Sequence, residues 1–245
     1  MIVLGIDIGG SGIKGAPVDL TTGTLAQDRV RIETPRPSDP KSVTRVVAEV
    51  ASRFDVTGPI GVTFPGVVTD GVVRTAANVD KEWIGVDAAD LFSAAVGRPV
   101  RVLNDADAAG VAEMTFGSGR GQTGLTILLT FGTGIGSAVF ANKVLVPNSE
   151  LGHLQLHGGE AEKWASENAR ETERLSWGEW ARRVQQYLRH LEDLVWPDLF
   201  IVGGGASKKA EKFLPLLEIR TPIVPATLLN NAGIVGAAMA ASSTR

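Results

Sequence analysis

Two short glycine-rich segments of this chain have the composition of phosphate-binding turns. The first, Gly9-Gly10-Ser11-Gly12-Ile13-Lys14, follows the run Ile2–Ile8, which is apolar except for Asp7. The second, Gly132-Thr133-Gly134-Ile135-Gly136, follows the apolar run Leu125–Phe131. Glycine allows unusual backbone angles and the close approach of a ligand, and the bare N–H groups of such turns form concave clusters that attract phosphate oxygens. Each segment therefore predicts a turn that can hold a phosphate group.

Both segments predict a strand, a turn and a second strand. This differs from the strand-to-helix context of the dinucleotide fingerprint and of the Walker A motif. An ordinary β-hairpin is the simpler interpretation of either segment taken by itself, because glycine pairs are common in hairpins. The repetition of Gly-(Ser/Thr)-Gly-Ile favours instead two halves of a duplicated fold that face one ligand.

A carboxylate and an amide follow the predicted buried strand Val100–Leu103, at Asn104 and Asp105. Ligands of open α/β sheets bind beyond the carboxyl ends of the strands, and a carboxylate there can accept the proton of an alcohol during phosphate transfer. The alternative is a helix N-cap, which Asp and Asn both favour. Asp107 is a competing candidate, but two residues along a helical turn its side chain points in another direction.

Two further segments carry groups that could bind ligands. Glu150 and His153, three residues apart, could contact neighbouring hydroxyls of one sugar or form a metal pair. His157 is the nearest further histidine and the chain has no cysteine, so a complete zinc site is not favoured. The run Gly203-Gly204-Gly205 precedes a predicted helix over Ser207–Leu214, whose N-terminus would favour an anion. Lys208, Lys209 and Lys212 add positive charge there, although a solvated basic face would explain them equally well.

Composition excludes several protein classes. Hydrophobic residues make up 44% and charged residues 21% of the 245 residues, as in an ordinary globular protein. The net charge of −3 gives no general attraction to nucleic acid or to anionic membranes. We find no signal peptide and no apolar run long enough to span a bilayer. We therefore expect a cytoplasmic enzyme that does not act on nucleic acid or membranes.

The order of the predicted elements indicates a two-lobed α/β protein. A β meander comes first, and strands then alternate with helices, which suggests the ribonuclease H-like unit of the actin and hexokinase superfold, with a central mixed sheet in each lobe. We expect a first lobe over residues 1–104, completed by a C-terminal helix over 228–245, and a second lobe over 105–227. A long helix begins at the capping box of Ser176 and Glu179. Its broad aromatic and aliphatic stripe predicts core packing, with an oligomer contact as the alternative.

The motifs together resemble the ROK family of bacterial sugar kinases and repressors, over essentially the whole chain. The segments that carry this resemblance are Asp7–Lys14, Asn104-Asp105-Ala106, Gly132–Gly136 and Glu150-Leu151-Gly152-His153. Within the family, Phe64–Val68, Thr75–Trp83, Pro197–Gly205 and Leu229–Ala237 are similar to the polyphosphate glucokinase subfamily. Most members carry a zinc-binding cysteine cluster after the Glu-x-Gly-His motif, and Leu154–Lys163 contains no cysteine. We therefore expect no zinc site.

The resemblance implies phosphorylation of glucose at its 6-hydroxyl, with Asp105 as the general base. Asp7 would hold Mg²⁺, directly or through water. The sugar contacts that the resemblance implies are Gly66, Asn78, Asn104, Glu150, His153 and Glu162. The phosphate contacts that we expect are Gly9, Gly10, Ser11, Gly12, Lys14, Gly132, Thr133, Gly134, Gly204 and Lys208.

The donor and the rival functions stay open at this point. The subfamily implies inorganic polyphosphate as the donor, with ATP as a second donor, and Lys14, Lys208, Lys209 and Lys212 as a basic track for the polyanion. A strictly ATP-dependent hexokinase would use the same sites. A non-catalytic sugar sensor, like the repressors of the family, is the alternative from another class, and a dinucleotide-dependent oxidoreductase is more distant. The family and the aromatic helix lead us to expect a homodimer.

Overall fold

The chain folds into two compact units, and it passes from the first unit to the second and back again. The computed structural model describes residues 1–76 and 79–242. The first unit is formed by Met1–Ala112 with Asn231–Arg245, and the second by Glu113–Asn230. The boundary lies inside helix α3 (Asp105–Phe116), whereas the sequence places it before this helix. The first part of α3 belongs with the first unit because Ala108 packs closely against Gly236 of the C-terminal helix.

The first unit is built on a mixed sheet of strand order β3-β2-β1-β5-β8, with β4 paired to β2. Strands β1 and β2 form an antiparallel hairpin, and β1, β5 and β8 run parallel to one another. The strands of this unit are β1 (Ile2–Gly9), β2 (Gly12–Asp19), β3 (Thr24–Leu25), β4 (Val30–Ile32), β5 (Ile60–Phe64), β6 (Val68–Thr69), β7 (Val72–Val73) and β8 (Val100–Asn104). Its helical segments are α1 (Pro40–Ser52), η1 (Lys81–Trp83), α2 (Ala88–Val96), the start of α3 and α7 (Ala232–Ser242).

Capping residues fix the starts of the two helices α1 and α2 of the first unit. Asp39 caps α1 by accepting a hydrogen bond from the Ser42 N–H at 2.9 Å, and Pro40 occupies the first turn. Asp87 caps α2, which ends at Gly97 in the left-handed conformation. Both helices bury apolar faces against one side of the sheet.

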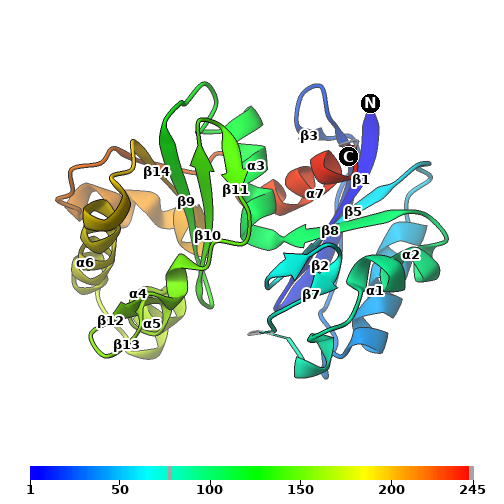
Figure 1. Ribbon diagram of the computed structural model, residues 1–245, viewed down its shortest axis with the longest axis horizontal. Coiled ribbons are helices and arrows are strands. Elements are labelled where there is room, and N and C mark those ends of the chain that lie inside the picture. The colour runs from blue at the N-terminus through cyan, green and yellow to red at the C-terminus, as the bar shows by residue number, and fades with distance from the viewer. Residues whose placement is uncertain (77–78, 243–245) are drawn as a thin grey trace. The chain divides into compact units, whose positions relative to one another are not determined.

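The other side of this sheet is covered by α7, drawn in red in Figure 1. Gly5 of β1 and Gly61 of β5 are partners in the parallel register. A Cβ atom at Gly5 would lie 2.0 Å from the Ile234 carbonyl oxygen, and one at Gly61 would lie 1.7 Å from the Ala237 carbonyl oxygen. The helix backbone therefore packs directly on the strand backbones, which no residue other than glycine would allow at these two positions.

The second unit has a mixed sheet of strand order β11-β10-β9-β14-β15. Strands β11, β10 and β9 are antiparallel, and β9, β14 and β15 are parallel, so this sheet repeats the hairpin-then-parallel pattern of the first. Its strands are β9 (Leu125–Phe131), β10 (Ile135–Ala141), β11 (Val144–Val146), β12 (Gln155–Leu156), β13 (Gly159–Glu160), β14 (Leu199–Gly204) and β15 (Ile223–Pro225). Its helical segments are η2 (Leu151–His153), α4 (Ala161–Ala165), α5 (Glu167–Thr172), α6 (Trp177–Val195), η3 (Gly205–Lys212), η4 (Leu214–Leu216) and η5 (Leu229–Asn231).

The long helix α6 confirms the predicted capping box of Ser176 and Glu179. Its stripe packs into the core of the second unit, where Trp180 and Tyr187 are fully buried. The stripe breaks down at the end of the helix, because Leu194 and Val195 are 55% and 45% exposed. Core packing is therefore the correct interpretation for most of the stripe.

The predicted helix over Ser207–Leu214 is wrong. The segment is a 3₁₀ helix, and it is interrupted at Lys209, which has non-helical backbone angles. It provides no α-helical N-terminus for an anion, so that argument for Gly204 and Lys208 falls away. The final α-helix begins at Ala232, after η5, rather than near Leu228. Across residues 1–76 and 79–242, none of the helices combines the length and apolar character that crossing a bilayer requires.

We predict that Gly61→Ala destabilises the protein, because the new methyl group would collide with the backbone of α7. The expected loss in the free energy of unfolding is about 1–3 kcal/mol or more, the range for overpacking. Gly178→Ala in α6 is the control, since no atom lies within 4 Å of its added Cβ. This control should be neutral or gain up to about 1 kcal/mol. Urea unfolding measures both, and an unchanged midpoint for Gly61→Ala would contradict the packing of α7.

Candidate functional site

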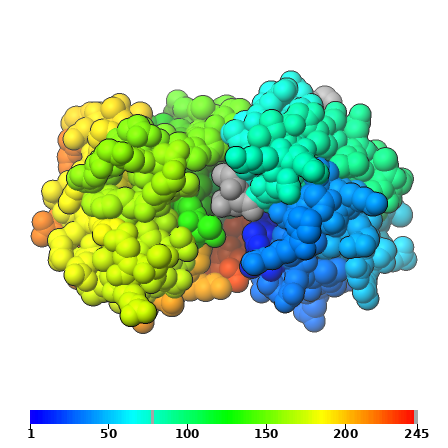
Figure 2. All heavy atoms as spheres, turned by 90° about the horizontal axis from the view of Figure 1, so that it is seen from below, coloured from blue at the N-terminus to red at the C-terminus, as the bar shows by residue number. Residues whose placement is uncertain are grey.

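The first glycine turn joins β1 and β2 at one end of the first sheet. Gly9 pairs with Gly12, so Gly10 and Ser11 form the exposed turn. The deep-blue atoms at this end of the sheet reach the surface in Figure 2. Lys14 lies opposite Asp7 in the register, and its Nζ atom is 3.6 Å from Asp7 Oδ2. The turn therefore has a carboxylate and an ammonium group immediately behind it.

Asp7 is held by a residue that the sequence did not single out. The buried Thr63 hydroxyl donates to Asp7 Oδ1 at 2.8 Å and accepts from the Ile8 N–H at 3.1 Å. On the other side, a Cβ atom at Gly233 of α7 would lie 2.8 Å from the same Asp7 oxygen. These contacts fix the Asp7 carboxylate, with Oδ2 turned toward Lys14.

Three polar side chains at the end of β8, those of Asn104, Asp105 and Asp107, have different surroundings. Asn104 is the helix cap: its Oδ1 accepts from the Asp107 N–H at 2.9 Å. Its Nδ2 donates to the Gly66 carbonyl at 3.2 Å, which brings two predicted sugar contacts together. Asp105, the first residue of α3, is half-buried and accepts from the Ala106 N–H at 2.9 Å. Asp107 is 3% exposed, so of the two aspartates Asp105 is the one that a substrate can reach.

Gly66 lies in a loop that closes on itself. A Cβ atom there would lie 2.5 Å from the Thr75 carbonyl oxygen, and the Val67 N–H donates to Thr75 Oγ1 at 2.9 Å. The close approach of the two loop strands explains why glycine is needed at this position. Asn78, the other predicted contact from this region, lies outside the described residues.

The second glycine turn, between β9 and β10, is held against Glu162. The Ile135 N–H donates to Glu162 Oε2 at 3.1 Å, and a Cβ atom at Gly134 would lie 2.2 Å from that oxygen. The Gly132 N–H donates to the Gly134 carbonyl at 3.0 Å, inside the turn. Within residues 79–242, no acceptor lies on the N–H groups of Thr133 and Gly134, which are the two donors that this turn offers.

The glycines of the two turns serve a different purpose from the one expected. None of Gly9, Gly10, Gly12, Gly132 and Gly134 has a φ angle in the left-handed region. At two of these positions a side chain approaches closely: Arg31 lies against Gly12, and Glu162 lies against Gly134. The expectation of unusual backbone angles was therefore wrong, and the close approach of a ligand to these turns stays a prediction.

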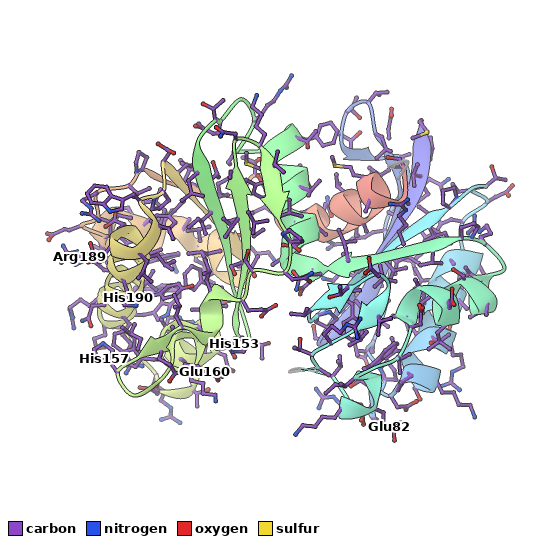
Figure 3. The ribbon with its side chains drawn as sticks, in the orientation of Figure 1. Glu82, His153, His157, Glu160, Arg189 and His190 are labelled. Carbon is purple, nitrogen blue, oxygen red and sulfur yellow. The ribbon has the colours of Figure 1, made fainter. Side chains whose placement is uncertain are left out.

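His153 lies between two carboxylates of the second unit. Its Nε2 is 3.5 Å from Glu150 Oε2, and its Nδ1 is 3.2 Å from Glu160 Oε1. Figure 3 shows His153 and Glu160 close together, with His157 farther along the β12–β13 hairpin. Glu160 is also ion-paired with Lys163 Nζ at 2.7 Å. His153 is therefore fixed at both ring nitrogens, and Glu160 is a positioning residue that the sequence did not indicate.

The same cluster has ligand atoms of His153, Glu160 and Glu162 that all lie within 4.8 Å of one another. This is one imidazole and two carboxylates, without a thiolate. Glu160 and Glu162 are already occupied by Lys163 and by the Ile135 N–H. The absence of the zinc site of the family remains an expectation that rests on the missing cysteines.

Burial shapes the electrostatics of this cluster. It raises the pKa of Glu150, while the charge of His153 opposes the rise and that of Glu162 adds to it. The hydrogen bond from Lys163 is the main reason why the pKa of Glu160 lies below its ordinary value. Of the two carboxylates that flank His153, Glu150 is thus the one that takes up a proton more readily.

Gly204 lies beside the second turn, because it pairs with Phe131 at the end of β9. Its φ angle is +76°, and a Cβ atom would lie 2.4 Å from the Phe131 carbonyl oxygen. The sheet therefore brings this predicted phosphate contact to the same edge as Gly132. Lys208 is exposed on the 3₁₀ segment that follows.

The lysines after Gly204 belong to a larger cationic group. Arg170 lies over the Trp177 ring at 4.2 Å, and Lys209 Nζ and Lys212 Nζ lie 5.8 and 5.7 Å from the same ring centre. Glu167 sits among them, next to Gly205, and burial raises its pKa while Lys209 and Arg170 oppose the rise. Sequence spacing had indicated the lysines, but Arg170 and Glu167 come from α5 and were missed.

We predict that Glu150 titrates above its ordinary value of 4.5, and that His153→Ala raises its pKa further by removing the opposing charge. Carboxyl ¹³C NMR of labelled protein measures both values. The folded state then holds the proton more tightly than the unfolded state. The free energy of unfolding should therefore fall as the pH rises from about 4.5 through the higher pKa of Glu150 in the folded protein. Glu150→Gln should remove that part of the pH dependence. A Glu150 pKa at or below 4.5 would contradict the burial argument.

Comparison with known proteins shows the family and the fold of this chain. The model of the ROK family matches residues 3–174. A polyphosphate glucokinase of Mycobacterium tuberculosis (strain CDC 1551 / Oshkosh) is 57% identical over 237 residues, which are 96% of this chain and 89% of the relative. The crystal structure of the inorganic polyphosphate/ATP-glucomannokinase of Arthrobacter sp. strain KM is similar with a TM-score of 0.96 and 52% identity, over 98% of each chain.

A second solved structure extends the comparison to a complex with ligands. The ROK family glucokinase of Streptomyces griseus, in complex with glucose and AMPPNP, is similar with a TM-score of 0.82 and 25% identity, over 98% of each chain. These likenesses confirm the actin and hexokinase type of fold, with a mixed sheet in each unit, that the sequence predicts. The chain belongs to the ROK family.

Proposed function

We propose that this protein is a polyphosphate glucokinase, which transfers a phosphoryl group from inorganic polyphosphate to the 6-hydroxyl of glucose and also accepts ATP. The high identity to relatives of that name over nearly the whole chain supports the reaction and the donor. The observation that carries the mechanism is the accessible Asp105 carboxylate at the carboxyl end of β8, beside the buried Asp107. In open α/β sheets, ligands bind beyond the carboxyl ends of the strands, which is where Asp105 lies.

Asp105 acts as the general base in this proposal. Its Oδ1 is oriented by the Ala106 N–H, and the carboxylate accepts the proton of the sugar hydroxyl as the phosphoryl group arrives. Little covalent work is required of the protein, because phosphoryl transfer depends mainly on positioning and on neutralising charge.

The sugar is held by hydrogen bonds to several hydroxyls. The contacts that we propose for the sugar are Gly66, Asn78, Asn104, Glu150, His153 and Glu162. The contacts of Asn104 with Gly66, and of His153 with Glu150, hold these groups in fixed orientations before the sugar binds. A sugar that lacks one of the hydroxyls would leave a polar partner unpaired, which is how such a site selects its substrate.

The contacts that we propose for the donor phosphates are Gly9, Gly10, Ser11, Gly12, Lys14, Gly132, Thr133, Gly134, Gly204 and Lys208. Asp7 fits Mg²⁺, because its carboxylate is a hard oxygen ligand that Thr63 holds in place and Mg²⁺ keeps several waters when few carboxylates are available. Bound Mg²⁺ would neutralise charge on the donor phosphates. Lys14, 3.6 Å from Asp7 Oδ2, would add charge at the same place.

A homodimer and a cytoplasmic location also remain proposals. The aromatic residues of α6 no longer support a dimer, because Trp180 and Tyr187 are in the core. Trp196, directly after α6, is 70% exposed and is the apolar side chain at that end most available to a second copy.

The name of the Arthrobacter protein adds a second sugar to test, since it is called a glucomannokinase. Mannose should therefore be compared with glucose as the acceptor. A sugar sensor is the remaining alternative, and it would bind glucose without phosphorylating it from either donor.

We predict that Asp105→Asn lowers turnover by about 10²–10⁴-fold, the usual contribution of a placed general base. Glucose binding should change little, because the amide keeps the shape of the carboxylate. Asp107→Asn is the matched variant two residues away and should keep most of the turnover, since its side chain is buried. Glucose 6-phosphate formation and glucose titration calorimetry measure the two effects. If Asp107→Asn loses turnover and Asp105→Asn keeps it, the assignment of the base is wrong.

We predict that the protein forms glucose 6-phosphate with polyphosphate and with ATP, and that chelation of Mg²⁺ by EDTA abolishes both activities. Added Mg²⁺ should restore them, while the thermal unfolding temperature without substrates should stay the same. Product formation from ATP but not from polyphosphate would favour the strictly ATP-dependent hexokinase. Full activity in EDTA would exclude the role given to Asp7.

A further inference from the structure

A row of three charged residues crosses the first sheet just behind the first glycine turn. Asp7 of β1 pairs with Lys14 of β2, and Lys14 pairs with Arg31 of β4. Residues directly opposite each other on adjacent antiparallel strands have their side chains on the same face, about 4.5–5.5 Å apart. The row therefore places one negative and two positive groups together, and it has an excess of positive charge.

Arg31 supplies this excess. Lys14 is paired with Asp7, whereas no carboxylate of residues 1–76 or 79–242 lies within ion-pair distance of the Arg31 guanidinium. The Arg31 side chain is exposed, so its charge is available to a ligand. Two neighbouring cations are favourable where an anion binds between or beside them.

The Arg31 guanidinium lies over the turn in a fixed position. Its Nη2 donates to the Ser11 carbonyl at 2.7 Å. A Cβ atom at Gly12 would lie 2.7 Å from Arg31 Nε and 2.9 Å from Nη2, so the glycine makes room for the guanidinium. This explains why residue 12 is a glycine although its φ angle lies outside the left-handed region.

Two carbonyl oxygens of the turn accept hydrogen bonds from β4 and from the residues after it. Ser11 O accepts from Arg31, and Gly9 O accepts from the Thr34 hydroxyl at 2.5 Å. Strand β4, through Arg31, and the nearby Thr34 thus bind these two oxygens, while Gly10 and Ser11 are exposed.

We propose that Arg31 binds the phosphate chain of the donor, next to the first glycine turn. A guanidinium offers a planar fork of N–H donors that matches phosphate oxygens, and four of its five donors remain after the bond to Ser11. The proposal rests on the proposed function for the identity of the donor. It identifies the class of ligand as a chain of linked phosphates, and it adds to Lys14 a second cation that sequence reasoning missed.

The test measures binding of inorganic polyphosphate without glucose, so that no turnover is needed. Arg31→Gln should weaken polyphosphate binding by about 10- to 100-fold, which corresponds to the loss of a charge-assisted hydrogen bond. The slope of log affinity against log salt concentration should become shallower by about 0.7–0.9, the value per phosphate contact in nucleic acids. Arg31→Lys should recover part of the affinity, because it keeps the charge but not the fork.

Arg53→Gln is the control for net charge. Arg53 is exposed at the end of α1, and its Nη2 is 3.0 Å from Glu49 Oε1. An exposed ion pair of this kind contributes little to stability. This variant should keep the affinity and the salt dependence of the wild-type protein.

The outcomes separate this inference from the proposed function. Unchanged polyphosphate affinity and salt slope in Arg31→Gln would overturn the inference, even if the enzyme phosphorylates glucose. If Arg31→Gln weakens polyphosphate binding and glucose binding to the same extent and also lowers the unfolding temperature, Arg31 only holds the turn in place. That result would overturn the inference as well. Arg31-dependent polyphosphate binding without any glucose 6-phosphate would support the inference and reject the proposed reaction.

Discussion

The first unit depends on direct contact between the backbone of α7 and the backbones of β1 and β5. Gly5 and Gly61 lie side by side in the sheet, and the carbonyl groups of α7 occupy the space where their side chains would be. The same helix brings Gly233 against the Asp7 carboxylate. The contact that closes the core therefore also fixes the acidic group behind the first turn, so packing and chemistry cannot vary independently there.

Long apolar runs and clear end signals made much of the fold predictable. The predicted runs Ile2–Ile8, Val100–Leu103 and Leu125–Phe131 lie in β1, β8 and β9, and α6 begins at the predicted capping box. Short elements such as β12 and β13 were missed, because two-residue strands leave no periodic pattern. The segment Gly205–Lys212 has helix-forming residues, but it is a 3₁₀ helix interrupted at Lys209, which composition does not reveal.

The candidate site was predictable where its residues form contiguous motifs, and not where partners come from distant segments. Asp7, Asn104, Glu150 and Glu162 were named from such motifs, and their roles remain proposals. Thr63, which orients Asp7 from 56 residues away, has no local signal. The position of Arg31 over the turn follows from the pairing of β4 with β2, which has no local signal either. Strand register, which the sequence left undetermined, decides these partnerships.

The first unit is discontinuous in the sequence, and this sets an order for its assembly on the ribosome. Strands β1 and β5 are synthesised early, but the helix that covers their glycine face comes from residues 232–242. Until those residues leave the ribosome, α7 does not cover that face of the nascent sheet, and the backbone at Gly5 and Gly61 is exposed to solvent. The second unit, which is one continuous stretch, can complete its core first, so the N-terminal half of the polypeptide should mature last.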